Sequence, residues 1–251
     1  MIDFFGEDDF AEQMKNVVVP FIAEHDREGD FSGAGGASLH YHALVNPDEK
    51  AAIVISHGFC EFFPKYHEMT YYFYQSGYSV FFIEHRGHGY SHREIDDIDK
   101  VHCKSFNNYV EDLKCFMDKV VSEKSLTKKY LLYCHSMGGC IGALFLERYP
   151  DCFSAAVLSS PMMQLNFRGI KPILVKILLV WSIIARWDKK YLPTQHGFDG
   201  INTYPKCSAL SEARHNYLFE YRLHDDHYRT NGGTYKWARE SFKGMKRSEE
   251  H

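Results

Sequence analysis

The sequence predicts an α/β fold, in which helices flank a mostly parallel β-sheet. Short apolar runs of strand length alternate with segments of helical period between about residues 38 and 160. Fully apolar runs of this length are typical of strands buried on both faces. Regular alternation of such strands with helices indicates parallel strands joined by right-handed crossovers.

Each element of this prediction rests on its own local pattern. The strand signals are apolar runs that end at turn residues, and they cover 38–45, 51–56, 78–83, 130–134 and 155–159. The helix signals are apolar residues with a spacing of three and four, and they cover 64–76, 105–119, 137–149 and 234–245. Gly77 follows the first of these helices and is a typical helix stop.

The alternation breaks between about residues 162 and 228. We therefore predict an α/β core over 1–161, a mainly helical cap over 162–230, and a returning helix with a tail over 231–251. The longest apolar run, 173–185, is interrupted by Lys176 and is shorter than the roughly 20 residues that a membrane-spanning helix needs.

Composition excludes some classes of partner. The net charge of −4 gives no basic surface of the kind that nucleic acid requires. The seven cysteines form no CxxC pair, and the acidic N-terminus does not resemble a secretory signal. These observations predict reduced thiols and a cytoplasmic protein, with membrane association as an alternative.

The most specific motif is CHSMGG at 134–139, between a predicted strand and a predicted helix. A nucleophile elbow needs this context, because a tight strand-to-helix turn holds the serine in a strained conformation. We predict that Ser136 is the nucleophile and that His135 and Gly138 shape the elbow. The usual pattern is G-x-S-x-G, and Cys134 replaces its first glycine. The alternative is a serine that merely caps a helix.

A second motif, HGFCE at 57–61, follows the earlier buried strand. In an acyl transfer, backbone N–H groups stabilise the negative charge that develops on the carbonyl oxygen. We predict that Phe59 and Met137 supply these N–H groups, and that His57 and Gly58 shape the loop. The alternative is an ordinary turn after a strand.

A third motif, EHRGHGYS, occupies 84–91. His85 and His88 could suggest a metal, but no third ligand accompanies them at a suitable spacing. We therefore predict no metal and no cofactor, and a structural loop in which Arg86 ties neighbouring backbone.

Together, the three motifs resemble the monoglyceride lipase and lysophospholipase branch of the α/β hydrolases, which is grouped with serine aminopeptidase-like hydrolases. The resemblance covers about residues 35–165 and extends more loosely to about 245. Glu84 and Cys134 depart from the family pattern. The resemblance implies hydrolysis of carboxylic esters of fatty acids, such as monoacylglycerol or lysophospholipid, through an acyl-enzyme on Ser136 and without a metal.

The acid and base of a catalytic triad are missing from this pattern. In this fold they follow the serine on loops after the last strands, whereas only KRSEEH follows the helix at 234–245. We expect the last two strands to be absent, the sheet edge to be unpaired, and the chain to be poorly active and poorly soluble. A substitute triad is disfavoured, although the chain offers several candidate residues for it: His215, His224, His227, Asp225, Asp226 and His251.

The apolar run of the cap suggests a partner. Its broad apolar face predicts either an acyl-chain tunnel or plain core packing, and is formed by Ile173, Leu174, Ile177, Leu178, Trp181 and Ile184. Lys171, Lys176 and Arg186 could rest the helix on an anionic lipid surface. Two other functions stay open: hydrolysis of amide or peptide bonds, and a non-catalytic domain that binds a lipid or a partner. Epoxide hydrolysis is disfavoured, because those relatives have Asp at the position of Ser136.

Overall fold

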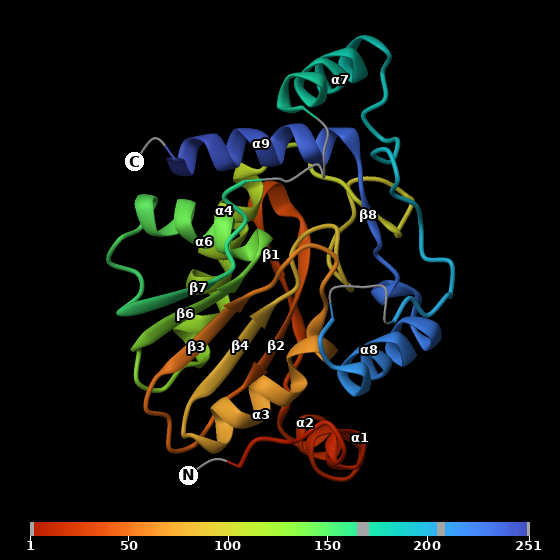
Figure 1. Cartoon of the computed structure of the whole chain (residues 1–251). Coiled ribbons are helices and arrows are strands. Elements are labelled where there is room, and N and C mark those ends of the chain that lie inside the picture. The colour runs from red at the N-terminus through yellow and green to blue at the C-terminus, as the bar shows by residue number, and fades with distance from the viewer. Residues whose placement is uncertain (1–2, 165–170, 205–208, 250–251) are drawn as a thin grey trace.

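A mostly parallel six-stranded sheet forms the centre of the computed structural model, which describes residues 3–164, 171–204 and 209–249 (Figure 1). The strand order is β1-β2-β4-β3-β6-β7. The strands are β1 Gly29–Ser32, β2 Ser38–Leu44, β3 Ala52–Ser56, β4 Ser79–Ile83, β6 Tyr130–His135 and β7 Ala155–Ser159. β3 pairs in parallel with β4 and β6, and β6 pairs in parallel with β7, whereas β1 and β2 are antiparallel additions.

Successive residues of the central strands face opposite layers of the molecule. Ile53 and Ile55 of β3 pack into the apolar cluster on one side, and Ala52 and Val54 pack into the cluster on the other. This alternation follows from the two-residue period of a strand. Because both faces are covered, the strand is apolar throughout, as the sequence pattern predicts.

Helices cover both faces of the sheet (Figure 1). One side carries α1 Phe10–Gln13, η1 Met14–Val18, α2 Val19–His25, η3 Phe63–Tyr66 and α3 His67–Gln75. The other side carries α4 Asn107–Phe116, η4 Met117–Val121, α5 Ser122–Lys124, α6 Met137–Arg148 and α9 Tyr235–Glu249. The remaining elements are η2 Ala34–Gly36, β5 Lys100–Val101, α7 Pro172–Ile184, α8 Glu212–His224, η5 Asp226–Tyr228 and β8 Gly232–Gly233.

The predicted strands and the four predicted helices are confirmed to within a few residues. The helices before β1, the strand β1 itself and the small β5–β8 pair were not predicted. These elements carry weak local signals, because two-residue strands and an edge hairpin depend on their neighbours for stability.

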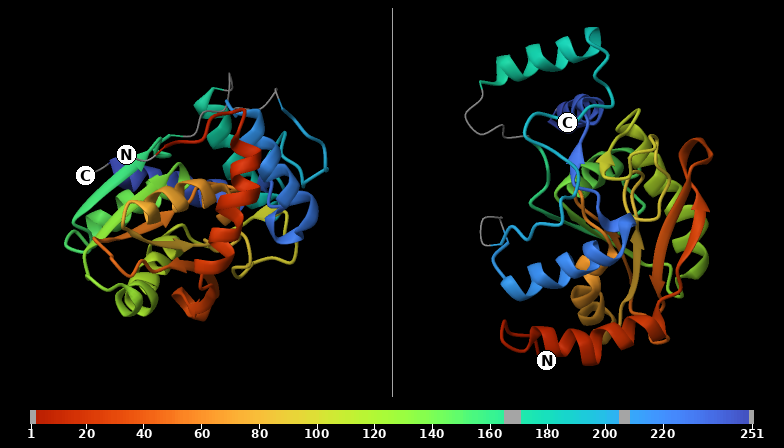
Figure 2. Two further views of the ribbon diagram at one scale, coloured as in Figure 1. Left: turned by 90° about the horizontal axis from the view of Figure 1, so that it is seen from below. Right: turned by 90° about the vertical axis from the view of Figure 1, so that its right-hand side faces the viewer.

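The segment between β7 and α9 is less helical than expected. Only α7, α8 and the short η5 are helical there, and α7 stands away from the sheet beyond α9 (Figure 2). The domain boundaries at 161 and 230 stay predictions.

The apolar face of α7 is largely exposed, so the prediction of plain core packing is wrong for most of it. Exposure lies between 54% and 69% for five of the six predicted side chains: Ile173, Leu174, Ile177, Trp181 and Ile184. Leu178 is half-buried. The side of α7 that packs against the protein is formed by Val175, Leu179 and Ser182.

Helix α8 is held against α3 and the N-terminal segment by contacts around Arg214. The Arg214 guanidinium contacts the Glu68 carboxylate of α3 at 2.6 Å and donates a hydrogen bond to the Phe5 carbonyl at 3.1 Å. The Ala213 N–H donates to Glu7 Oε1 at 2.7 Å. The N-terminal segment therefore holds both α3 and α8.

Among the described residues, β7 pairs with β6 alone and forms an edge of the main sheet. Val157 of this strand is 58% exposed. No helix in the described part of the chain has the length and apolarity needed to cross a bilayer. The six described cysteines form no disulfide, and Cys207 lies outside the described residues.

Candidate active site

Ser136 occupies the sharp turn between strand β6 and helix α6. Its backbone angles are φ 51° and ψ −113°, a conformation that non-glycine residues rarely adopt. The turn is held by the Ser136 N–H, which donates to Ser159 O at 3.1 Å, and by the Gly139 N–H, which donates to Ser136 O at 2.9 Å. The strain is concentrated at the predicted nucleophile, which stands at the N-cap position of α6 but makes no side-chain capping hydrogen bond to it.

The small residues around Ser136 allow helix and sheet to approach closely. A methyl group on Gly138 would lie 2.0 Å from the Ser56 carbonyl oxygen, so the first turn of α6 rests on the end of β3. Cys134, which replaces the first glycine of the usual elbow pattern, is accommodated by Gly142 of α6. A methyl group there would lie 2.4 Å from Cys134 Sγ, so the absence of a side chain at Gly142 leaves room for the thiol.

The loop at 57–61 lies beside the elbow. A methyl group on Gly58 would be 3.0 Å from His135 Nδ1, which brings the loop to the residue before Ser136. Within the described residues, neither the Phe59 N–H nor the Met137 N–H donates a hydrogen bond. Two unused amide donors on adjacent segments are what an oxyanion site requires.

The Glu61 side chain binds the start of this loop, and it also contacts the neighbouring His135. Its Oε2 atom accepts hydrogen bonds from the Gly58 N–H and the Tyr66 hydroxyl, both at 2.6 Å. Its Oε1 atom pairs with Lys65 and lies 2.9 Å from His135 Nδ1. Burial raises the pKa of Glu61, but the contacts with His135 and Lys65 outweigh burial and hold this pKa well below its usual range. Glu61 is thus a buried carboxylate with four partners.

Replacing Glu61 by Gln is expected to lower the free energy of unfolding by about 3 kcal/mol, because the Lys65 and His135 groups would lose a buried anionic partner. Urea denaturation at neutral pH measures the change. The control is Glu123→Gln, since Glu123 is exposed and has no ion pair among the described residues. Equal stability of the Glu61 and Glu123 variants would contradict this role.

Three fully buried histidines support the loop from the other side. The His57 Nε2 atom accepts the His85 N–H at 3.0 Å, and His88 Nε2 accepts the Cys60 N–H at 3.1 Å. His85 Nε2 lies 2.8 Å from the Ser56 hydroxyl. His85 and His88 therefore have structural partners on the 56–60 segment.

Arg86 has different partners from those predicted. It ties one backbone carbonyl, that of Ala34, but its main contacts are ion pairs with Asp112 at 2.6 Å and with Glu94 at 2.9 Å. The sequence gives no sign of these partners, because Asp112 lies 26 residues further along the chain and Glu94 lies beyond the end of the 84–91 motif.

Stability should fall as the pH drops below about 6.5, the pKa of histidine in an unfolded chain. Burial lowers the pKa of His57, His85 and His88, and it lowers the pKa of His67 to about 3. The folded state therefore binds fewer protons than the unfolded state. The stabilisation is complete above pH of about 6.5 and is lost progressively below it, at about 1 kcal/mol per histidine and pH unit.

Urea midpoints between pH 7.5 and 5 test this prediction. His67→Gln should reduce the slope by about one proton, whereas His224→Gln should not change it, because His224 is exposed. His42 does not oppose the trend below pH of about 6.5, but it does above that pH. Burial lowers the pKa of His42, but Asp26 and Glu84 outweigh burial and raise this pKa to about 9, so its contribution to stability is complete below pH of about 6.5 and is lost as the pH rises from there through 9. A flat profile below pH 6.5 would contradict the prediction.

No histidine ring in the described part of the chain forms a hydrogen bond with the Ser136 hydroxyl. The three described histidines that are candidates for a substitute base have other partners: His215 contacts Asn202, His224 contacts Glu220, and His227 contacts Asp225. Asp225 also accepts the Tyr90 hydroxyl, and Asp226 pairs with Arg229. His251 lies outside the described residues. None of the five described candidates, His215, His224, His227, Asp225 and Asp226, forms a base–serine pair with Ser136.

Two surface hollows of about 650 and 330 Å³ lie elsewhere. The larger is lined by the N-terminal segment and α3, including Phe4, Asp9 and Tyr71, and the smaller is lined by Asp99, Phe198 and Arg229. Neither includes Ser136 or a residue of α7, so neither is the predicted acyl-chain tunnel.

The elbow, the adjacent amide donors and the parallel sheet agree with a comparison against known families. Residues 47–251 match the hydrolase family described as "Serine aminopeptidase, S33". The chain belongs to this family. Its place in the α/β-hydrolase fold and in the lipase branch of that fold is thereby confirmed.

Individual members of this family have informative names. The chain is 30% identical to lysophospholipase L2 of Escherichia coli over 238 residues, which cover 94% of this chain and 68% of that protein. It is 31% identical over 159 residues to monoacylglycerol lipase of Mycolicibacterium smegmatis, with 63% and 54% covered. The structure of a monoglyceride lipase variant from Saccharomyces cerevisiae shares the fold at a TM-score of 0.64, with 16% identity and 89% and 68% covered. These three proteins are named as a lysophospholipase or as lipases, and the chain spans 68%, 54% and 68% of their lengths.

Proposed function

We propose that this protein is a serine ester hydrolase that cleaves carboxylic esters of fatty acids, such as monoacylglycerol or lysophospholipid. The observation that carries the proposal is the strained backbone of Ser136, at φ 51°, between β6 and α6. The names of the relatives from Escherichia coli and Mycolicibacterium smegmatis support the substrate class.

In this mechanism the Ser136 hydroxyl attacks the ester carbonyl carbon. The N–H groups of Phe59 and Met137 stabilise the oxyanion, the alcohol leaves, and the acyl group stays on the serine until water releases it. His57, Gly58, His135 and Gly138 position the two segments. The mechanism needs a base to take the serine proton, and the described residues present no imidazole to that hydroxyl. We therefore also propose that the activity of this chain is impaired.

The test is labelling with a fluorophosphonate probe, followed by hydrolysis assays on monoacylglycerol, lysophospholipid and peptide amide substrates. Ser136→Ala should lose all labelling, while Ser160→Ala should keep it; Ser160 is an exposed serine that follows Ser159, whose carbonyl accepts the Ser136 N–H. Preference for the amides would favour the peptidase alternative. Labelling that survives in Ser136→Ala would refute Ser136 as the nucleophile.

A second candidate function is a non-catalytic domain that binds a lipid or a protein partner. It is favoured by the Ser136 hydroxyl, which has no imidazole partner among the described residues. It predicts binding of lysophospholipid by the protein without labelling or turnover.

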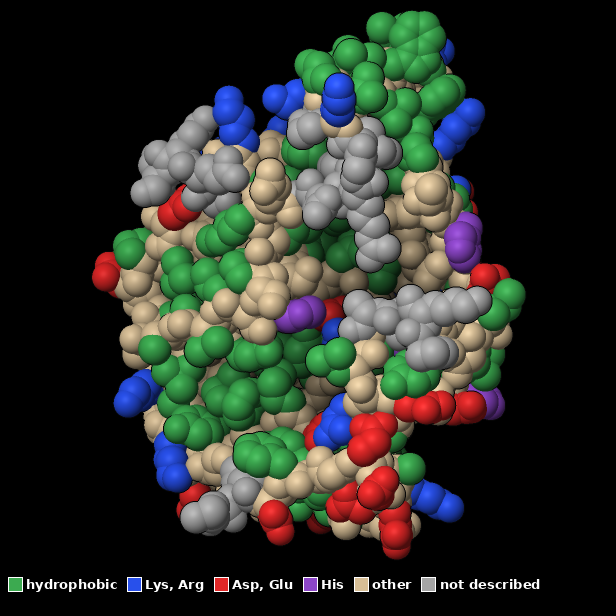
Figure 3. Space-filling view, in the orientation of Figure 1, with side chains coloured by type: hydrophobic (Ala, Val, Ile, Leu, Met, Phe, Trp, Pro, Cys, Tyr) green, Lys and Arg blue, Asp and Glu red, His purple; other side chains and the backbone are tan. Residues whose placement is uncertain are grey.

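We also propose that α7 rests on an anionic lipid surface. Apolar side chains gather over this helix with basic side chains beside them (Figure 3). Trp181 and Ile184 are 54% and 69% exposed, and Lys171, Lys176 and Arg186 are exposed on or near the same helix. This combination is typical of helices that lie in the lipid interface.

Sedimentation with vesicles tests the membrane contact. The protein should pellet with phosphatidylglycerol vesicles, and Trp181→Glu combined with Ile184→Glu should reduce the bound fraction at least about fivefold. The control is Leu126→Glu, because Leu126 is equally exposed, at 57%, but lies before β6, in the loop that follows α5. Equal pelleting of both variants would contradict the proposal.

A further inference from the structure

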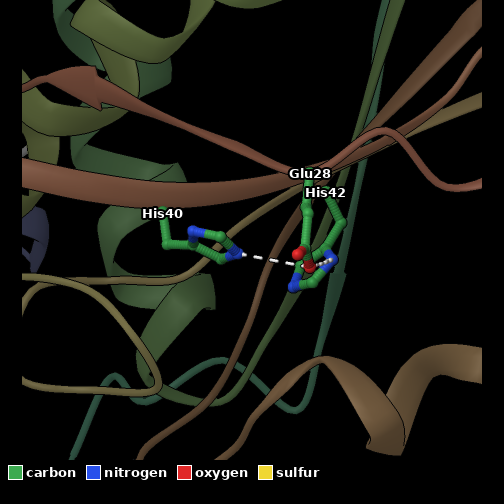
Figure 4. Close-up of side chains that lie close together, drawn as sticks. All are labelled: Glu28, His40 and His42. Carbon is green, nitrogen blue, oxygen red and sulfur yellow. Dashed lines mark ion pairs between the residues drawn. The ribbon is translucent and has the colours of Figure 1, made fainter.

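A group of imidazole and carboxylate side chains gathers on one face of the β1–β2 hairpin, on the antiparallel side of the sheet. Asp30 pairs with His40 across the hairpin. His42 lies two residues beyond His40, and Glu28 two residues before Asp30, so all four side chains share one face. Figure 4 shows the imidazoles of His40 and His42 directed toward the Glu28 carboxylate.

The distances among these groups fit a single metal ion. His40 Nε2 lies 3.7 Å from Glu28 Oε2, and His42 Nδ1 lies 4.0 Å from the same oxygen. One ligand atom from each of Glu28, His40 and His42 lies within 4.8 Å of the others. Two ligands that each stand about 2.0–2.2 Å from zinc are about 3–4 Å apart. The Glu28 side chain is 68% exposed, so its carboxylate can adjust its position over the imidazoles.

Carboxylates behind the histidines orient them. Asp30 Oδ1 lies 2.9 Å from His40 Nδ1, and Asp26 Oδ2 lies 2.7 Å from His42 Nδ1. Metal-binding histidines typically donate one ring N–H to a carboxylate in this way and bind the metal through the other nitrogen, as His40 can through Nε2. At His42 the nitrogen that lies 4.0 Å from Glu28 is Nδ1, so Asp26 adjoins the ion there and Nε2 faces Glu84.

Both of the other ring nitrogens are buried and unused. His40 Nε2 and His42 Nε2 have no hydrogen-bond partner among the described residues, and neither has Glu84 Oε1, which lies 3.9 Å from His42 Nε2. The His42 side chain is only 5% exposed. An ion on His40 Nε2 would satisfy that buried nitrogen, and an ion on His42 Nδ1 would leave the ring proton of His42 on Nε2, facing the Glu84 carboxylate.

The charge of the group also favours a cation. Four carboxylates converge on the two imidazoles: Asp26, Glu28, Asp30 and Glu84. In the described part of the chain, their ion-pair partners are these two histidines, and no lysine or arginine pairs with them.

We propose that Glu28, His40 and His42 bind a divalent transition-metal ion of the zinc class. Two imidazole nitrogens and one carboxylate oxygen suit Zn²⁺, whereas Mg²⁺ and Ca²⁺ prefer oxygen ligands alone. The ion connects β1 to β2, and through Glu84 it stabilises the start of the 84–91 loop, where Glu84 Oε2 accepts the Tyr90 N–H at 2.6 Å. Its role is structural, because Ser136 lies on the other side of the parallel strands, at the end of β6.

The rival occupant of these atoms is a proton on His42, shared with Asp26 and Glu84. This alternative needs no metal, and it keeps the same residues together. Direct measurement of metal binding separates the two explanations.

The experiment is titration of the EDTA-treated and dialysed full chain with ZnCl2 and, separately, with MgCl2, followed by calorimetry. One equivalent of Zn²⁺ should bind in the micromolar range or more tightly, Mg²⁺ should not bind, and Zn²⁺ should raise the melting temperature. Glu28→Gln and His40→Gln should each weaken Zn²⁺ binding at least about tenfold. The control His224→Gln, which alters a histidine that is 78% exposed, should bind as the parent does.

A second readout guards against variants that fold poorly. Co²⁺ bound by two histidines and a carboxylate gives visible absorption bands, and these should be lost in Glu28→Gln, which alters an exposed side chain and leaves the hairpin intact. The absence of saturable Zn²⁺ binding by the parent protein would overturn the proposal. Binding that both substitutions leave unchanged would overturn it as well.

Discussion

The purified 251-residue protein is expected to hydrolyse p-nitrophenyl butyrate at least about a thousandfold more slowly than the Escherichia coli lysophospholipase L2 measured beside it. The reason is the environment of Ser136. Its backbone has the strained conformation of a nucleophile, but no described histidine ring forms a hydrogen bond with its hydroxyl. Without an imidazole, the hydroxyl is deprotonated too rarely, and only oxyanion stabilisation and binding remain.

Added imidazole should restore part of this rate, because a small base can reach a half-buried hydroxyl. The imidazole-dependent rate in the parent protein should exceed that in Ser136→Ala, which reports only the reaction of imidazole with the ester in solution. A parent protein with ordinary lipase rates, or imidazole dependence that is equal in both proteins, would show that the deficit has another cause.

Gly138→Ala is expected to destabilise the protein by at least about 3 kcal/mol, since overpacking against backbone forces the main chain to move. The added methyl would lie 2.0 Å from Ser56 O and 2.7 Å from His57 O, and neither backbone oxygen can rotate away. Thermal unfolding should show a melting temperature lowered by about 6–12 °C. The same displacement would move the Met137 N–H relative to Phe59, so fluorophosphonate labelling should also decline.

The matched control is Gly35→Ala. Gly35 has a φ of 68° but open space around it, so its cost is that of a left-handed alanine, about 1 kcal/mol. Similar losses in the two variants would mean that the contact between α6 and the end of β3 is not tight.

Much of the fold could be predicted, because its signals are local. The strands of the parallel core are short apolar runs, and the helices beside them have a clear apolar period. The edge hairpin escaped prediction for a physical reason. Residues 29–32, GDFS, contain one large apolar side chain, and the strand forms only because β2 offers free hydrogen-bonding groups beside it.

Some residues of the candidate site could likewise be predicted from local signals, and others could not. The positions of Ser136, Met137 and Phe59 follow from where strands end, and a strand end is visible in the sequence. The contacts of Glu61 with His135 and of Arg86 with Asp112 join distant segments, and these leave no local pattern. The pair His40 and His42 is visible as H-x-H, but its carboxylate partners come from 26–30, whose pairing could not be foreseen.

The exposure of α7 shows the limit of periodicity most clearly. An apolar stripe predicts that a helix will contact something apolar, but it does not identify the contact. Here α7 packs on α9 through Ser182, whose hydroxyl accepts a hydrogen bond from Arg239 at 2.6 Å, and most of its stripe faces outward.

The clasp that the N-terminal segment forms on α8, with Glu7 bound to Ala213 and Arg214 and Phe5 bound to Arg214, has a practical consequence for work with this protein. A purification tag attached to the N-terminus would emerge next to the joint between α8 and α3, where its bulk or charge could pull the clasp apart. Protease sensitivity near residues 209–212, compared between proteins with tags at opposite ends, would reveal whether the fusion itself loosens the contact of α8 with α3.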